Sequence, residues 1–188
     1  YADWLKSCPA GHLDSRMLEA DLMFRRIGIT FAVYGEGENT ERLIPSDPVP
    51  RIISASEWEF LEKGLEQRVT ALNMFLHDVY HDGKIFKDGI IPAEKIYKNA
   101  QFQPCMMGLD LPKQIYSHIS GVDIIRNSDG NYYVLEDNLR VPSGVSYMLQ
   151  NRRMSQRLFP ELFDRYQVLP VERYPSLLRQ TLSECSFY

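Results

Sequence analysis

The chain has 188 residues, 44% of them apolar, and carries a formal net charge of −4 with an isoelectric point near 5.6. The apolar fraction is sufficient for a packed core, while the acidic balance argues against a protein that wraps duplex nucleic acid or binds a membrane surface. No apolar run approaches the length needed to span a bilayer.

Cysteine usage and the first residue bear on where the protein works. Cys8, Cys105 and Cys185 are far apart and show neither zinc-ligand spacing nor a paired framework. This pattern is typical of a reducing compartment, and we expect a cytoplasmic protein. The chain opens at Tyr1 without a signal peptide or an initiator methionine, so we expect the numbering to begin inside a longer protein.

The first quarter of the chain predicts a helix followed by a strand pair. Apolar spacing indicates a helix over 17–27, and the β-branched and aromatic residues of 27–34 predict a strand. A turn at 35–39 then leads to a short return strand at 41–44. Three prolines keep 45–50 extended or looped, because proline cannot donate to a ladder or a helix interior.

The clearest helix start lies at Ser56, which forms a capping-box motif with Glu59. The helix is predicted to end near Tyr80. Its apolar residues recur at helical spacing and predict one buried stripe: Leu61, Leu65, Leu72, Leu76 and Val79. A short helix is expected at 92–99, followed by an irregular segment at 101–112 that is rich in methionine and proline.

Two apolar runs on either side of Asp129-Gly130 predict a β-hairpin, since Asp-Gly is a strong turn signal. With these two residues at the centre of the turn, the register follows by counting. Ser128 then pairs with Asn131, Ile124 with Leu135, Asp123 with Glu136, and Gly121 with Asn138. Because side chains alternate along a strand, Asp123, Glu136 and Asn138 are expected on one face.

Two carboxylates and an amide oxygen on one small patch suggest a metal site. Asp123 opposite Glu136 costs about 3 kcal/mol of repulsion at an effective dielectric near 20, and a divalent cation removes that cost. Hard oxygen ligands suit Mg²⁺ or Mn²⁺, and Gly121 is expected to leave open space opposite Asn138. The alternative is a solvated acidic face that serves solubility.

Another helix is predicted to begin at Pro142-Ser143-Gly144 and to run to about Leu158. Free N–H groups at a helix start favour anions, so Ser143 and Gly144 could bind one through their backbone. Ser143 also fits a plain N-cap, and the two interpretations are compatible. Pro160 interrupts the helical pattern, and a last short helix is expected at 174–182.

The segment 121–144 resembles the metal-binding end of the ATP-grasp enzymes, in which an Asp on one strand and Glu-x-Asn on the next hold Mg²⁺ against the ATP phosphates. Further strings narrow this resemblance to the circularly permuted ATP-grasp family related to glutathionylspermidine synthase: ERLIPSDPVPRII (41–53), SEWEFLEKGLEQRV (56–69), FLHDVYHDGKIFKDGIIP (75–92), NAQFQPCMMGLDLP (99–112) and YVLEDNLRVPSGVSYML (133–149). The similarity covers roughly residues 18–163. It implies an α+β fold, a partial ATP-grasp domain with an antiparallel sheet and packed helices.

The resemblance assigns Asp123, Glu136 and Asn138 as Mg²⁺ ligands that neutralise the phosphates of bound ATP. It also places Arg140 where a planar guanidinium would reach a phosphate or an acyl phosphate, with a surface ion pair as the competing interpretation. Here Arg140 is expected on the same face as Asn138, on a strand that continues past it. We expect Ser143 and Gly144 to bind an anion.

Gly121 departs from the family pattern, because many ATP-grasp proteins carry arginine two positions before the metal-binding aspartate. Either the acyl-transfer site differs from the standard one, or another residue such as Arg51 or Arg140 supplies that charge. Arg51 follows three prolines that fix the backbone leading into it, and it could instead cap a helix or pair with Glu59.

The resemblance divides the chain into an N-terminal α/β segment at 1–112, the metal-binding hairpin with its helix at 113–165, and a connector at 166–188 toward a missing C-terminal half. It implies part of an ATP-dependent carboxylate–amine ligase that works through an acyl phosphate on a small-molecule or peptide carboxylate and an amine. The alternative is an inactive nucleotide-binding or scaffolding protein, and a metal-dependent hydrolase is a third. Neither nucleic acid nor a membrane is expected as a partner.

Overall fold

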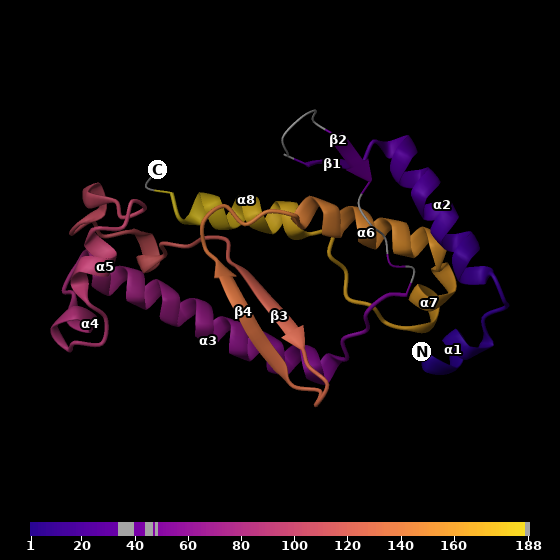
Figure 1. Cartoon of the computed structure of the whole chain (residues 1–188), viewed down its shortest axis with the longest axis horizontal. Coiled ribbons are helices and arrows are strands. Elements are labelled where there is room, and N and C mark those ends of the chain that lie inside the picture. Colours follow the sequence, from indigo (N-terminus) through magenta and orange to yellow (C-terminus); the bar gives the residue numbers. More distant parts are fainter. Residues whose placement is uncertain (34–39, 44–46, 48, 187–188) are drawn as a thin grey trace. The chain divides into compact units, whose positions relative to one another are not determined.

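The computed structural model describes residues 1–33, 40–43, 47 and 49–186, and its elements are mixed helices and strands (Figure 1). The chain forms two compact units, one made of 1–52 with 144–173 and the other of 53–143 with 174–188. The division into three segments at 112 and 165 stays a prediction. None of the described helices combines the length and apolar composition needed to cross a bilayer.

The first unit contains a helical layer and a small hairpin. Its elements are α1 (Ala2–Ser7), α2 (His12–Ile27), β1 (Thr30–Val33), β2 (Thr40–Leu43), α6 (Val145–Leu158) and α7 (Pro160–Arg165). The helix predicted from residue 17 begins earlier, and β1 pairs with β2 in antiparallel fashion. The predicted turn at 35–39 lies outside the described residues, as does most of the proline-rich stretch 44–48.

The core of this unit lies between α2 and the α6–α7 pair. Phe24 on α2 and Phe159 at the junction of α6 and α7 are almost fully buried. The remaining members of the core are Ala20, Ile29, Met154, Leu158 and Leu162. Pro160 ends α6 and begins α7 at its first turn, where proline is well tolerated, so the predicted interruption is confirmed.

The second unit is organised by one long helix. Its elements are α3 (Ala55–Tyr80), α4 (Lys84–Lys87), α5 (Ala93–Tyr97), the 3₁₀ turns η1 (Pro104–Met106) and η2 (Pro112–Gln114), β3 (Gly121–Arg126), β4 (Tyr132–Asn138) and α8 (Tyr174–Glu184). The apolar stripe predicted on α3 is buried or half-buried.

The capping box of α3 lies two residues before the predicted position. Ser54 accepts a hydrogen bond from the Glu57 N–H, and the Glu57 carboxylate accepts one from the Ser54 N–H. The prediction of Ser56 with Glu59 is therefore wrong. The sequence holds the motif twice, at Ser54–Glu57 and at Ser56–Glu59, and the motif alone does not choose between them.

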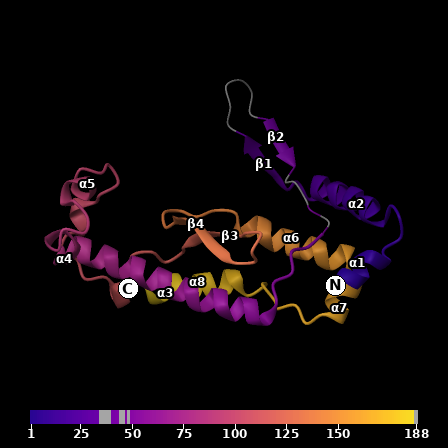
Figure 2. The ribbon, with the colours of Figure 1, turned by 60° about the horizontal axis from the view of Figure 1, so that its bottom comes forward.

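The far end of α3 fixes the approach to the β3–β4 hairpin. The Asn73 carboxamide oxygen accepts hydrogen bonds from the backbone N–H groups of Tyr116 and Ser117, at 2.8 and 3.0 Å. Tyr116 stacks on Tyr80 of the same helix with ring centroids 5.9 Å apart. These contacts fasten the segment just before β3 to the helix, so α3 and the hairpin belong to one framework (Figure 2).

We expect Asn73→Ala to lower the free energy of unfolding by about 2 kcal/mol, because two largely buried N–H groups lose their acceptor. Urea unfolding followed by circular dichroism measures this loss. Asn99→Ala is the matched control: the Asn99 side chain accepts only the Gln101 N–H in an exposed turn, where water replaces it, so the loss should be less than about 1 kcal/mol. Equal losses in the two variants would contradict the role of Asn73.

Candidate functional site

The β3–β4 hairpin has the predicted pairing at one end and a different pairing at the other. Asp123 pairs with Glu136 and Gly121 with Asn138, as predicted, but Ile124 pairs with Val134 rather than with Leu135. The turn is closed by the Asn127 N–H, which donates to the Asn131 carbonyl oxygen at 3.0 Å, so its loop holds three residues instead of two, with Gly130 in the left-handed conformation at φ 85°. A bulge at Leu135 compensates for the longer loop.

The pairing assigns the hairpin side chains to two faces. Val122, Ile124, Arg126, Tyr132, Val134 and Asp137 alternate onto one face, and Gly121, Asp123, Ile125, Tyr133, Glu136 and Asn138 onto the other. We call the first of these the helix face, because its side chains contact α3, and the second the open face. Asp123, Glu136 and Asn138 are thus neighbours on the open face, and all three are exposed.

Two polar contacts fasten the helix face to α3. The Arg68 guanidinium donates to both carboxylate oxygens of Asp137, Nε to Oδ1 at 2.7 Å and a terminal nitrogen to Oδ2 at 2.6 Å. Near the turn, Arg126 forms an ion pair with Glu57 at 2.9 Å. Hydrogen bonding from Arg68 lowers the pKa of Asp137 below its ordinary value.

An apolar groove of about 540 Å³ lies between these two contacts. Leu61, Leu65 and Leu72 line it from α3, and Ile124, Tyr132 and Val134 line it from the hairpin. The hairpin therefore reaches the helix through long polar side chains at two points with apolar space between them.

The open face carries the predicted metal ligands without a neutralising partner. Among the described residues, no basic side chain forms an ion pair with Asp123 or Glu136. The Asn138 amide nitrogen donates to one Glu136 oxygen at 3.1 Å, which orients the two side chains together and leaves the Asn138 carbonyl oxygen without a described partner. Two carboxylates and one amide oxygen fit a hard divalent cation.

This set of ligands is incomplete as a protein-only site. Within the described part of the chain there is no group of three or more His, Cys, Asp or Glu side chains that could hold a metal ion. Mg²⁺ commonly binds to one or two carboxylates and takes its other ligands from water and substrate phosphates. The open face thus fits a cation that arrives with a phosphate ligand better than one held by protein alone.

Gly121 does not leave open space, contrary to the prediction. A Cβ at this position would lie 3.0 Å from the Cβ of Pro142 and 3.4 Å from that of Asn138. Pro142 therefore covers position 121, and a longer side chain there requires Pro142 to move.

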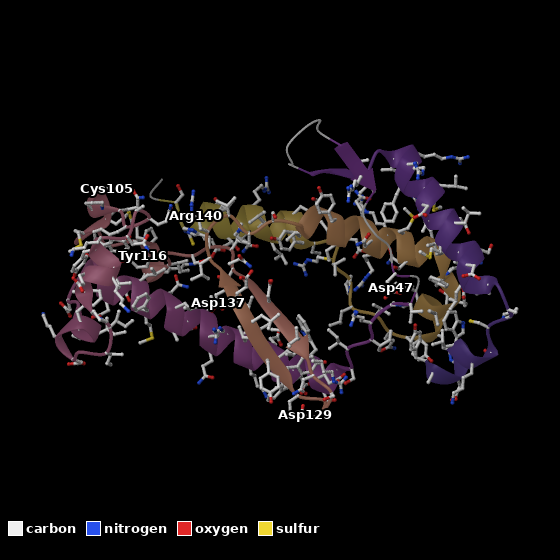
Figure 3. The ribbon with its side chains drawn as sticks, viewed as in Figure 1. Asp47, Cys105, Tyr116, Asp129, Asp137 and Arg140 are labelled. Atoms are coloured by element: carbon white, nitrogen blue, oxygen red, sulfur yellow. The ribbon has the colours of Figure 1, made fainter. Side chains whose placement is uncertain are left out.

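Arg140 does not continue the open face. Strand β4 ends at Asn138, and Val141 has a positive φ of 50°, which is unusual for a β-branched residue and turns the chain sharply. Arg140 is exposed and lies at the end of the hairpin opposite the turn that carries Asp129 (Figure 3). The structure thus brings Arg140 to the same end of the hairpin as Glu136 and Asn138, but not onto their strand.

The start of α6 differs from the prediction at Ser143. The residue preceding the helix is Gly144, with φ 97°, and no side chain caps the first turn. The N-cap assignment of Ser143 is therefore wrong, because the left-handed backbone needed there suits glycine. The uncapped N–H groups of the first turn keep the capacity to bind an anion.

The predicted site residues fall into both units. Asp123, Glu136, Asn138, Arg140 and Ser143 belong to the unit of 53–143, whereas Arg51 and Gly144 belong to the unit of 1–52 with 144–173. Arg51 is exposed in an irregular segment, and the cap of α3 is Ser54 rather than Arg51. A role for Arg51 stays a prediction.

Arg68 was missed by sequence reasoning. The apolar stripe of α3 continues through Val69 between Leu65 and Leu72, so Arg68 stands beside the stripe as an exposed charged residue of ordinary appearance. Its partner Asp137 lies on β4, and no local pattern connects the two residues.

Comparisons with known proteins show which protein family this chain belongs to. The profile of a family described as a circularly permuted ATP-grasp matches residues 50–187, and the chain belongs to this family. The matched residues include the antiparallel β3–β4 sheet and the helices from α3 to α8, which form part of such a domain.

Several relatives extend the match over nearly the whole chain. An uncharacterised protein of Synechocystis sp. is 43% identical over 181 residues, which cover 96% of this chain and 37% of that protein. An uncharacterised protein of Mycobacterium leprae is 44% identical over 182 residues, or 97% of this chain and 32% of the relative. A Frankia casuarinae protein with the provisional name glutamate–cysteine ligase 2-2 is 38% identical over 172 residues, or 92% of this chain and 20% of the relative. The chain thus spans about a third of the length of the first two relatives.

We expect Gly121→Ala to lower the free energy of unfolding by about 1 to 3 kcal/mol, because the added methyl group overlaps Pro142. Urea unfolding measures the change. The matched control is Gly64→Ala in the middle of α3, where no atom lies within 4 Å of the added Cβ and alanine favours the helix by about 0.5 to 1 kcal/mol. The two variants should therefore differ in sign. A stabilising Gly121→Ala would contradict the close contact with Pro142.

Proposed function

We propose that this chain supplies the metal-binding hairpin of an ATP-dependent ligase that joins a carboxylate to an amine through an acyl phosphate. The observation that carries the proposal is the pair of directly opposed carboxylates, Asp123 and Glu136, beside Asn138 on a face without a described basic partner. Membership of the ATP-grasp family supports nucleotide binding, and the name of the Frankia relative supports ligation.

The residues of the hairpin have separable roles in this proposal. Asp123, Glu136 and Asn138 would hold Mg²⁺ or Mn²⁺, which neutralises the phosphates of ATP and stabilises the charge that develops as the terminal phosphoryl group is transferred. Arg140 is free to reach an anionic oxygen from the end of the hairpin, since it is exposed and has no described ion-pair partner. The peptide segment Ser143–Gly144 would bind a phosphate or carboxylate through the N–H groups that follow it.

The proposal also covers substrates and location. A small-molecule or peptide carboxylate and an amine would be the substrates, without nucleic acid or a membrane as partner. The three cysteines are all free thiols, which supports a reducing compartment such as the cytoplasm.

We expect Asp123→Ala and Glu136→Ala to abolish Mg·ATP binding to the full-length protein, because each removes one of the two charged ligands. In the absence of metal, their free energy of unfolding should stay unchanged or rise by less than about 1 kcal/mol: the repulsion between opposed carboxylates is removed, but both groups are exposed, so water screens it well below its value at a dielectric near 20. Isothermal titration calorimetry with ATP and Mg²⁺ measures the binding.

Asp129→Asn is the control for these variants. This substitution removes one carboxylate from the turn at the other end of the same hairpin and keeps an acceptor for the Asn131 N–H. The affinity of the variant for Mg·ATP should therefore match that of the wild type. Wild-type affinity in Asp123→Ala and Glu136→Ala would remove the metal assignment.

A second function, nucleotide binding or scaffolding without bond formation, is favoured by one observation. Pro142 covers position 121, where many family members carry an arginine. Release of ADP by the full-length protein in the presence of a panel of carboxylates and amines separates the two functions. Release that requires both substrates supports the ligase, whereas nucleotide binding without turnover supports the second function. Phosphate release without an amine would indicate a hydrolase.

A further inference from the structure

The segment Glu136-Asp137-Asn138 divides its side chains between the two faces of the hairpin. Glu136 and Asn138 are on the open face, and Asp137 between them is on the helix face. The Asp137 side chain is only 17% exposed and accepts two hydrogen bonds from the Arg68 guanidinium, one from Nε and one from a terminal nitrogen. A bidentate pair of this kind fixes orientation as well as distance, because the two planar groups must lie in one plane.

The apolar groove makes this pair important for the placement of β4. The groove leaves open space between α3 and the middle of the hairpin, so apolar packing alone does not fix how the strand is rotated about its own axis. A rotation of β4 that moved Glu136 and Asn138 would also move Asp137, to which both are directly bonded in sequence. The Arg68–Asp137 pair opposes that rotation.

The second contact, at the turn, holds the other end of the hairpin on the helix. Glu57 and Arg68 are about 16 Å apart along α3 at the rise of an α-helix, and Tyr132 and Asp137 are about 17 Å apart along β4. The Tyr132 hydroxyl donates to the Glu57 carboxylate at 3.5 Å, next to the Glu57–Arg126 ion pair. Because the two spacings match, both contacts form at once, and only the one at Arg68 is next to the predicted metal ligands.

We propose that Arg68 is a positioning residue that holds Glu136 and Asn138 toward the bound cation by fixing Asp137 on the opposite face of β4. The inference rests on the proposed metal-binding function of the hairpin. Arg68 touches neither metal nor nucleotide in this role. It acts through Asp137, and its neutralisation of that carboxylate leaves Asp123 and Glu136 as the charged ligands on the open face.

The test compares Arg68→Met with Arg126→Met in the full-length protein. Each variant breaks one of the two ion pairs between α3 and the hairpin, so both should lose a similar amount of thermal stability. Affinity for Mn²⁺ in the presence of ATP, measured by electron paramagnetic resonance, should fall at least about tenfold in Arg68→Met, which is usual when a residue supporting a metal ligand is removed. In Arg126→Met it should stay within about twofold of the wild type.

The dependence of ADP release on Mg²⁺ adds a second measurement. In Arg68→Met the Mg²⁺ concentration for half-maximal rate should rise about tenfold, while the rate at saturating Mg²⁺ stays near that of the wild type. Asp137→Asn keeps the size of the side chain and removes the charge that Arg68 pairs with, so it should show the same shift. This variant decides the question if Arg68→Met does not fold.

The outcomes separate this inference from the proposed function. If Asp123→Ala loses Mn²⁺ binding while Arg68→Met and Asp137→Asn keep it, the positioning role alone is overturned. Equal losses of Mn²⁺ affinity in Arg68→Met and Arg126→Met would also overturn it, because the effect would then be one of general stability. Wild-type Mn²⁺ affinity in Asp123→Ala would overturn the proposed function and this inference with it.

Discussion

The period of two along a β-strand is the constraint on which the candidate site depends. It sends Glu136 and Asn138 to one side of β4 and Asp137 to the other. Asp137 holds the strand on α3, and its two neighbours lie on the open face as the proposed metal ligands. A shift of one residue in the register would turn Asp137 outward and place Glu136 and Asn138 against the apolar groove, which is unfavourable for unpaired polar groups.

Charge pairing follows the same division. On the helix face, Asp137 and Arg126 each have an oppositely charged partner on α3. On the open face, Asp123 and Glu136 have none among the described residues. Surface ion pairs contribute little to stability in general, so the main effect of the pairs on the helix face is geometric. The unpaired carboxylates concentrate negative charge where the proposed cation would bind.

Local patterns in the sequence predicted much of the fold. The apolar stripe gave α3, and the Asp-Gly signal together with counting gave the pairing of Asp123 with Glu136. That pairing was right although the turn was wrong, because the three-residue loop and the bulge at Leu135 shift the register in opposite directions. A bulge leaves no mark in a hydrophobic pattern, so only the strand pairing of the folded chain reveals it.

What the sequence could not predict depends on contacts between distant residues. Arg68 and Asp137 are 69 positions apart, and Asn73 and Tyr116 are 43 apart. Neither pair belongs to a local motif. The close approach of Pro142 to Gly121 likewise follows from the sharp turn after β4, where Val141 has a conformation that its residue type disfavours. At the start of α6 the N-cap is Gly144 and not the predicted Ser143, because the backbone there is left-handed and this conformation favours glycine.

The bulge at Leu135 has a consequence for how this hairpin can vary among related proteins. Because the extra residue lies between the turn and the Asp123–Glu136 pair, a relative whose turn is one residue shorter and that also lacks the bulge would keep the same pairing at these two positions. Insertions and deletions at the tip should therefore occur together with changes at Leu135, whose side chain is 62% exposed and tolerates them. The number of residues between the positions of Asp123 and Glu136 would then differ among related proteins while the pairing of the two positions stays the same.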